Sequence, residues 1–324
     1  MSDLISNFAK QIEDMISLRS SMGRSSNTHR NNLINFDRFC YTNFPTETEL
    51  EREMVLEWIK KRPNENAGGQ QARASAIRCF GSYLDAMGIP AYVLPDKFVG
   101  GNSNFTPYLF NDEELSSLFR AIDNLRPTSR YPFQHLILPV LFRMIYTCGL
   151  RPREGRELLL KNIDFETGEI LITETKGHKE RIVVMSDDML RLCQIYGQKL
   201  RIFAPDSKCF FPGTDDNYLS GTWINNQLQK CWLDANPNQT PDTLPRVRVY
   251  DLRHRFASEI LNRWLDEKKD LHSMLPRLRA YMGHSALSGT AYYIHLLPEA
   301  LVKNSGIDWG NLTDMLPEVD IWGE

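Results

Sequence analysis

The stretch from residue 250 to residue 295 decides the fold and the chemistry that we expect, and it reads YDLRHRFASEILNRWLDEKKDLHSMLPRLRAYMGHSALSGTAYYIH. Its first part has apolar residues at helical spacing and carries Arg253 in the segment Asp-Leu-Arg-His. His284 follows a glycine where the helical pattern breaks, and Tyr293 comes nine positions later. An arginine, a histidine and a tyrosine in this order suggest a site that holds an anion and attacks it with a phenol.

Five short motifs lie along the chain: GLRPRE at 149–154, TKGHKER at 175–181, YDLRH at 250–254, GHS at 283–285 and YIH at 293–295. They resemble those of the tyrosine recombinase (phage integrase) family, and they occur in the order of that family at similar spacings. Any one of them alone is a weak signal, whereas five in order are specific. The resemblance covers the chain from about residue 107 to residue 298.

The resemblance implies an enzyme, a site-specific DNA recombinase or integrase that cuts and rejoins DNA through a 3′-phosphotyrosyl intermediate. Tyr293 is the implied nucleophile, and Lys176 is the implied acid that protonates the leaving 5′ oxygen. Arg151 and Arg253 would hold the phosphate, because a planar guanidinium donates two parallel hydrogen bonds and keeps its charge. His284 would donate a further hydrogen bond to the phosphate. Because the covalent link conserves the bond energy, the implied strand transferase needs no ATP, no metal and no cofactor.

The two arginines are also expected to favour ionisation of Tyr293, because a phenol has a reference pKa of about 10. Pro152 predicts a helix start directly after Arg151, and Glu154 is expected to support this arginine or else to act only as a partner of the helix dipole. The chain departs from the family at Tyr250, where a histidine is usual. A tyrosine is a poor base at neutral pH, so the group that accepts the proton of the nucleophile stays open.

Helical periodicity dominates the chain, and two β-branched runs at 169–173 and 181–185 predict a hairpin whose turn carries Lys176 and Lys179. The predicted fold class is mainly α with a small β-sheet. It combines a helical domain similar to the core-binding (SAM-like) domain of the family with an α+β catalytic domain of the tyrosine recombinase type. The expected boundaries are residues 1–95 for the helical DNA core-binding domain, 96–106 for a linker, 107–298 for the catalytic domain and 299–324 for an acidic tail.

Basic residues on two helices of the first domain are candidate DNA contacts. Arg30 and Arg38 lie on the polar side of the second predicted helix, and Arg73 and Arg78 are expected on the outward side of the fourth. Lys179 is a further candidate in the predicted hairpin. The alternatives are ordinary solvated helix faces and, for the hairpin lysines, edge residues that discourage strand aggregation.

Composition sets limits on the class of protein. The net charge of the 324 residues is −3, and removing the −5 carried by residues 299–324 leaves +2, so DNA binding would depend on local clusters of charge. The six cysteines are scattered without metal-ligand spacing, which favours reduced thiols, and no apolar run is long enough to span a bilayer. We expect a cytoplasmic, nucleoid-associated protein of a prokaryote or a mobile element.

The expected partner is double-stranded DNA with a specific recombination site, bound by a self-assembly that is a tetramer in synapsis. The apolar residues of the tail, Leu301 and Val302 among them, suggest a segment that docks on a neighbouring protomer; packing on its own domain and disorder are the alternatives. A type IB topoisomerase-like nicking-closing enzyme shares the same catalytic side chains. A DNA-binding homologue with impaired catalysis is the third possibility, suggested by Tyr250.

Overall fold

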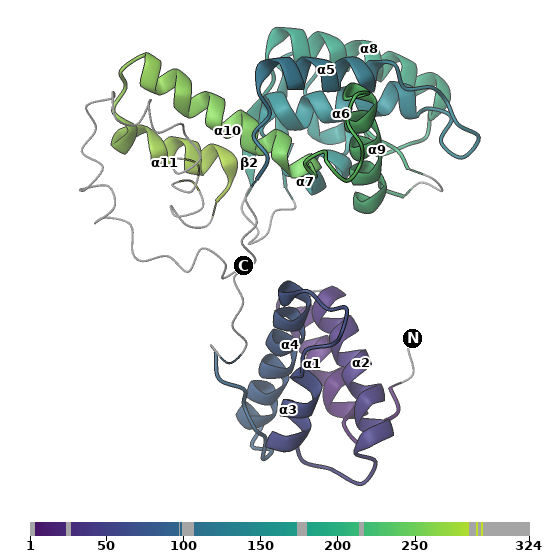
Figure 1. Ribbon diagram of the computed structural model, residues 1–324, viewed down its shortest axis with the longest axis vertical. Helices are drawn as coiled ribbons and strands as arrows, with labels where there is room; N and C mark the ends of the chain where they lie inside the picture. The colour runs from purple at the N-terminus through teal and green to yellow at the C-terminus, as the bar shows by residue number, and fades with distance from the viewer. Residues whose placement is uncertain are drawn as a thin grey trace. The chain divides into compact units, whose positions relative to one another are not determined.

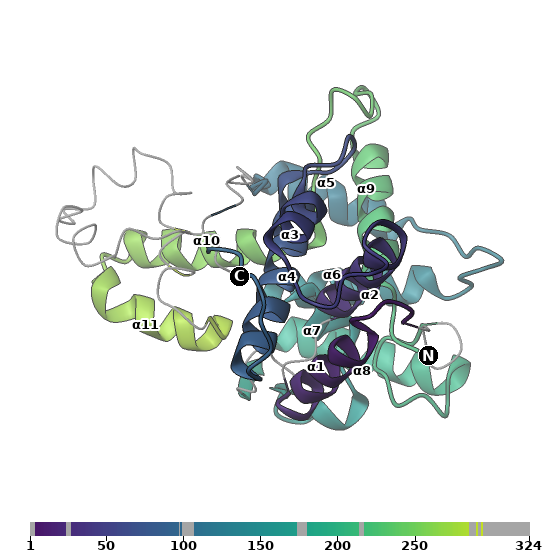
Figure 2. The same cartoon turned by 90° about the horizontal axis from the view of Figure 1, so that it is seen from below.

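The chain forms two compact units, Met1–Phe105 and Thr106–Glu324, in a computed structural model (Figures 1 and 2). Each unit is described by itself below. The residues that the structure describes are 4–23, 27–96, 98, 107–173, 180–213, 217–284, 290 and 293.

The first unit is a bundle of helices (Figure 1), and aromatic side chains form the centre of its core. Phe36 is fully buried at its centre, with ring centroids 5.4 Å from that of Trp58 and 6.3 Å from those of Phe8 and Phe80. Rings at this spacing bury a large apolar area and fix the packing of the bundle. The helices are α1 (Ala9–Ser21), α2 (Asn27–Asn43), α3 (Arg52–Ile59) and α4 (Ala67–Ala86).

The helix α3 begins later than its apolar pattern predicts. The pattern predicts a helix from Glu47 to Lys61, whereas Leu50 is extended and forms a bridge with Ala91. The carbonyl oxygen of Leu50 accepts a hydrogen bond of 2.7 Å from the backbone of Tyr92. This long-range pairing keeps the residues before Arg52 out of the helix, and local spacing cannot reveal it.

The prediction that Arg73 lies on the outward side of α4 is wrong. Its side chain is 4% exposed, pairs with Glu65, and donates hydrogen bonds to the carbonyl oxygens of Trp58 and Lys60 at the end of α3. Those terminal carbonyls lack partners within the helix, so a buried guanidinium stabilises the helix end.

Arg78 also differs from the outward position that we expected. It is half-buried and donates to the carbonyl oxygens of Leu94, Pro95 and Asp96, which ties α4 to the segment that follows it. Arg30 and Arg38 are exposed on α2 as expected, and their contact with DNA stays a prediction.

Among the residues described for the second unit, the regular elements are helices and one antiparallel pair of strands, which confirms the predicted fold class. Its core surrounds α6 (Gln134–Cys148), which packs against α5, α8 and α10. The other elements are α5 (Asp112–Asp123), α7 (Pro152–Arg156), the 3-10 turn η1 (Leu160–Asn162), β1 (Glu169–Ile172), β2 (Arg181–Val184), α8 (Asp187–Phe203), α9 (Gly221–Ala235), α10 (Val249–Asp266) and α11 (Leu271–Met282). The helices α10 and α11 lie side by side (Figures 1 and 2).

Two glycines in the left-handed region end helices and present functional residues. Gly149 has a φ of 61° at the end of α6, and a Cβ there would lie 2.4 Å from the Phe256 ring. Gly283 has a φ of 65° at the end of α11, and a Cβ there would lie 3.0 Å from Nη1 of Arg181. Larger residues are therefore strained at both positions. The first glycine precedes Arg151, with Pro152 beginning α7 as predicted, and the second precedes His284.

The strands β1 and β2 pair with Ile172 opposite Arg181, close to the hairpin bounds that we predicted. Their connection carries Lys176 and Lys179, and both lysines lie outside the described residues, as does the tail at 299–324. All six cysteines are free thiols. Within the described part of the chain, no helix is long and apolar enough to cross a membrane.

Candidate active site around Glu154 and Tyr293

The carboxylate of Glu154 is the centre on which the arginines of the site converge. Its Oε1 accepts hydrogen bonds from Nη1 of Arg151 at 2.8 Å and from Nη1 of Arg181 at 2.9 Å. Its Oε2 accepts from the backbone N–H of Arg151 at 2.9 Å and from Nη2 of Arg181 at 2.7 Å. Nη1 of Arg253 lies 3.9 Å from the same oxygen. Three guanidiniums around one carboxylate leave an excess of positive charge, which suits an anionic ligand.

The protonation state of Glu154 follows from these contacts. Burial alone would raise its pKa, but hydrogen bonds and charge from Arg181, with the backbone of Arg151 and the charge of Arg253, hold the pKa at about 2. The carboxylate is therefore charged at neutral pH. Its hydrogen bonds fix the orientation of the guanidinium groups of Arg151 and Arg181. This agrees with the expected support of Arg151 by a salt bridge of 2.8 Å.

Arg253 lies on α10 and is fully buried. It donates to the carbonyl oxygen of Gly149 at 2.7 Å and to that of Met282 at 2.6 Å, so it links the ends of α6 and α11. Its Nη2 also lies 3.0 Å from Nε2 of His284. Arg151 reaches the same region, because its Nη2 donates to the carbonyl oxygen of Gly283.

The contacts of His284 fix its tautomer. A guanidinium can only donate hydrogen bonds, so Nε2 of His284 accepts from Arg253 and carries no proton. Nδ1 therefore carries the proton and donates to Oγ1 of the buried Thr290 at 2.9 Å. Burial and the charges of Arg253 and Arg151 lower the pKa of His284 to about 3. In this state Nε2 has no proton to donate, so the expected hydrogen bond to phosphate would require Arg253 to release Nε2 and Nε2 to gain a proton.

Tyr293 is 2% exposed and packs against the apolar faces of α10 and α11. Its ring centroid lies 5.4 Å from that of His254 and 6.0 Å from that of His284. Burial raises the pKa of Tyr293 to about 12, although the charge and a hydrogen bond of Arg253 favour the phenolate. The arginines favour ionisation of Tyr293 as expected, but desolvation outweighs them in this state and the net pKa is raised.

Tyr250 lies in the first turn of α10, at the margin of the site. Its side chain is 36% exposed, and its ring centroid lies 5.9 Å from Cζ of Arg253 and 5.0 Å from the ring of His254. Burial and the charge of Arg253 lower the pKa of His254 to about 3. The neutral imidazole and the phenol thus flank the guanidinium, and neither is a strong base in this state.

The structure brings together most of the residues that the sequence singled out, and it adds one that sequence reasoning missed. Arg181 is the last residue of the TKGHKER motif, and no function was predicted for it from the sequence. In the structure it makes the bidentate pair with Glu154. The signal was present in RIVVM, because alternation places Arg181 on the buried side of a strand with Val183, where a cation needs a partner. The predicted residues that meet here are Arg151, Glu154, Tyr250, Arg253, His284 and Tyr293.

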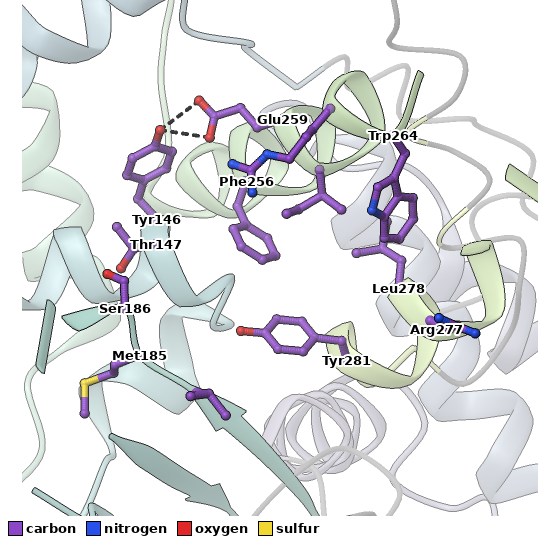
Figure 3. A pocket seen from close by; sticks show the side chains of 13 residues that line it. Tyr146, Thr147, Met185, Ser186, Phe256, Glu259, Trp264, Arg277, Leu278 and Tyr281 are labelled. Atoms are coloured by element: carbon purple, nitrogen blue, oxygen red, sulfur yellow. Dashed lines mark hydrogen bonds between the residues drawn. The ribbon is translucent and has the colours of Figure 1, made fainter. Parts of the chain in front are cut away.

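A cavity of about 720 Å³ lies beside the site, between the ends of α6 and β2 and the helices α10 and α11. Phe256 and Tyr281 stack across it with ring centroids 5.7 Å apart, and Trp264 lies near Leu278 at its other side (Figure 3). The hydroxyl of Tyr146 donates to the carboxylate of Glu259 at one wall (Figure 3). Two exposed arginines, Arg263 and Arg277, also line the cavity.

The sequence profile of the phage integrase family matches residues 110–300, more than half of the chain. The chain belongs to the phage integrase family. The resemblance stated from the five motifs is thereby confirmed, and with it DNA strand transfer and site-specific recombination as the activity.

Relatives in sequence agree with this membership, and solved structures share the fold. An integrase/recombinase of Sinorhizobium fredii is 27% identical over 288 residues, which cover 88% of this chain and 90% of the relative. The tyrosine recombinase XerD of Rhizobium meliloti is 28% identical over 242 residues, covering 72% of each chain. The site-specific recombinase XerH, solved in a post-cleavage complex with its palindromic difH substrate, has a TM-score of 0.63 at 19% identity and covers 93% of this chain and 84% of its own. The integrase of transposon Tn1549, solved with transposon right end DNA, has a TM-score of 0.60 at 13% identity and covers 90% and 97%.

Protonation of His284, which contacts Arg253, makes the folding stability depend on pH. The pKa of His284 is about 3 in the folded chain and about 6.5 when unfolded, so its contribution to stability is complete above pH 6.5 and is lost as the pH falls toward 3. We expect the stability difference between the wild type and His284→Gln to narrow between pH 7.5 and pH 5. Thermal melting measures it, and each kcal/mol corresponds to about 2 to 4 °C.

The comparison with the variant is needed because Asp251 acts in the opposite direction. Burial raises the pKa of Asp251 to about 6, so its protonation adds stability as the pH falls below that value. A difference between wild type and His284→Gln that stays constant across this range would show that His284 is not held neutral by the fold.

Proposed function

We propose that this recombinase cuts DNA by attack of Tyr293 on a phosphodiester whose non-bridging oxygens are held by Arg151 and Arg253. The observation that carries the proposal is that three guanidinium groups surround the single carboxylate of Glu154 and leave a net positive charge. The phenol of Tyr293 interacts with one of them, Arg253. Donors fixed around a site where negative charge develops stabilise the transition state, because they need no reorganisation during the reaction.

The remaining roles follow from the chemistry of the step. The phosphorus–oxygen bond to the 5′ side breaks as the bond to Tyr293 forms, the phenolic proton of Tyr293 passes to water, and Lys176 gives the leaving oxygen its proton. His284 can donate a hydrogen bond to the phosphate once Arg253 turns toward that ligand and Nε2 of His284 takes up a proton. The phosphotyrosyl bond keeps the energy for rejoining, so the cycle uses neither ATP nor a metal ion.

Access to the site is part of the proposal. Arg253 and Tyr293 are both buried. A phosphate can reach them only if the side chains that cover them move, and the rise in the pKa of Tyr293 caused by burial would fall with that exposure. Binding and cleavage are therefore separable steps, and DNA contact precedes activation of the nucleophile.

The first unit is proposed to be the core-binding domain at residues 1–95, joined by the linker at 96–106 to the catalytic domain at 107–298. Together they would hold a specific site on double-stranded DNA, with Arg30 and Arg38 of α2 contacting phosphates. Recombination joins two duplexes, so we propose a tetramer in synapsis. The place of action is the nucleoid in the cytoplasm of a prokaryotic cell, where the protein serves recombination or a mobile element.

A nicked duplex tests the proposed reaction. Candidate duplexes are taken from the DNA that flanks the gene and selected by gel shift, and a nick near the scissile phosphate lets the cut fragment diffuse away. The proposal predicts a covalent adduct that resists denaturant and forms without ATP and in the presence of a chelator. Relaxation of plasmids that lack the selected site, without recombination, would instead indicate a topoisomerase-like enzyme.

The acidic tail is proposed to dock in the cavity between α10 and α11 of a neighbouring copy. The tail at 299–324 combines apolar residues with six acids, and the cavity combines aromatic walls with Arg263 and Arg277. Apolar burial would supply affinity, and the opposite charges would favour this pairing over others. Docking of the segment that follows Tyr293 would couple placement of the nucleophile to assembly.

Truncation after Pro298 is expected to leave binding to a single site intact and to remove cooperative binding to paired sites. Recombination should fall more than cleavage of a nicked duplex, because the chemistry needs only one active site. Trp264→Glu in the cavity should reproduce the effect in the full-length chain, while Ile202→Glu on the exposed face of α8 is the control. Gel shifts on DNA with one and two sites measure this, and unchanged cooperativity in the truncated chain would rule out docking in trans.

A further inference from the structure

Arg181 occupies the base of the hairpin that carries the proposed acid. It is the first residue of β2 and pairs with Ile172, the last residue of β1. Lys176 lies in the connection, four positions after Ile172 and five positions before Arg181. The contacts of Arg181 therefore determine how this end of the strand pair is held.

The guanidinium of Arg181 joins the hairpin to two other parts of the site. Nη1 and Nη2 donate to the two oxygens of Glu154 at 2.9 and 2.7 Å, and Nε donates to the carbonyl oxygen of Tyr281 at 2.8 Å. The Arg181 side chain is 9% exposed and that of Glu154 is 4% exposed, so water competes little for these bonds. All three nitrogens of the guanidinium thus bind acceptors of the protein.

The close approach of the α11 end to Arg181 makes the arrangement specific. A Cβ at Gly283 would lie 3.0 Å from Nη1 of Arg181 and 3.3 Å from its Cδ and Cζ. The backbone that presents His284 therefore packs directly on the guanidinium, and the carboxylate on its other side is the one that orients Arg151. The guanidinium of Arg181 thus connects the base of the hairpin with α7 and with the end of α11.

We propose that Arg181 is a positioning residue, which fixes the base of the hairpin so that Lys176 reaches the leaving 5′ oxygen. The inference rests on the proposed function, in particular on Lys176 as the acid. A group that acts on a leaving atom must be held closely, and a displacement of about 1 Å can cost about 10²-fold in rate. A lysine at 181 would keep the charge but could not form the bidentate pair together with the third bond.

The test is strand cleavage by Arg181→Gln and Arg181→Lys on a nicked duplex from the DNA that flanks the gene. We expect cleavage to slow by about 10²-fold in the glutamine variant, with unchanged DNA binding. Replacing the bridging 5′ oxygen by sulfur should restore most of the lost rate, because a thiolate leaves without protonation. Lys176→Ala should show the same rescue, whereas Arg151→Ala should gain little from it.

The matched control is Arg143→Gln, which breaks a bidentate pair with Asp123 at 2.7 Å in the same unit and should leave cleavage unchanged. Arg181→Lys keeps a positive charge beside the buried Glu154, so the same cleavage test can be made with this variant if the glutamine variant does not fold. Wild-type rates in the folded variants would overturn the inference, and so would a loss that the sulfur substrate does not restore. If the wild type itself forms no adduct, the proposed function fails and the assignment of Arg181 fails with it.

Discussion

Replacing Tyr293 with phenylalanine abolishes strand cleavage and leaves DNA binding intact. The change removes one oxygen and keeps the ring, so the packing of a side chain that is 2% exposed between α10 and α11 is preserved. Without the phenolic oxygen no phosphotyrosyl bond can form, and the expected loss is complete. Denaturing gels with labelled nicked DNA measure the adduct, and gel shifts measure binding.

Tyr196→Phe is the matched control for that experiment. Tyr196 is also 2% exposed, and its hydroxyl donates to the carbonyl oxygen of Phe210 at 2.9 Å within the core of the same unit. Its loss should cost about 1 kcal/mol of stability and no cleavage. An adduct formed by Tyr293→Phe at the rate of the wild type would contradict the assignment of the nucleophile, and Tyr292→Phe would then be the next variant.

Replacing Arg253 with lysine is expected to slow cleavage by about 10² to 10³-fold, since a donor aimed at a developing charge is typically worth this much. The loss should exceed any change in DNA affinity, because many other phosphates contribute to binding. A lysine at this buried position cannot reach the carbonyl oxygens of Gly149 and Met282 together with the phosphate. Single-turnover cleavage and gel shifts on the same duplex separate the two effects.

Arg156→Lys is the control for the arginine substitution. Arg156 lies in the same unit and donates to the carbonyl oxygen of Leu219 at 2.8 Å, so the change also disturbs a contact to the backbone. We expect a small change in melting temperature and none in cleavage. If Arg253→Lys lowered binding and cleavage equally, the guanidinium would act in holding DNA and not in the transition state.

Local signals in the sequence predicted those parts of the site that local backbone geometry determines. Pro152 marks the start of α7 and so places Arg151 directly before it, and the glycine before His284 marks the end of α11. The helical spacing around Arg253 likewise predicted α10. Each of these features depends on a few neighbouring residues, so the sequence alone was sufficient to place the side chains on their elements.

Features that depend on distant partners were not predictable in the same way. Arg73 was expected to face outward, but the free carbonyls at the end of α3 and Glu65 draw its guanidinium into the first unit. The contacts of Arg181 are made with Glu154 and Tyr281, which are far away in the sequence. The pKa of Tyr293 rises because the chain buries the ring, a consequence of packing that neighbouring charges do not offset.

The measurement that tests the central claim most directly is identification of the amino acid joined to DNA in the covalent complex. The adduct formed on the nicked duplex is digested with trypsin and nuclease, and mass spectrometry locates the residual nucleotide. We predict a 3′-phosphonucleotide on the oxygen of Tyr293 and on no other residue. A nucleotide on Tyr292, on a serine or at a 5′ phosphate would contradict the account.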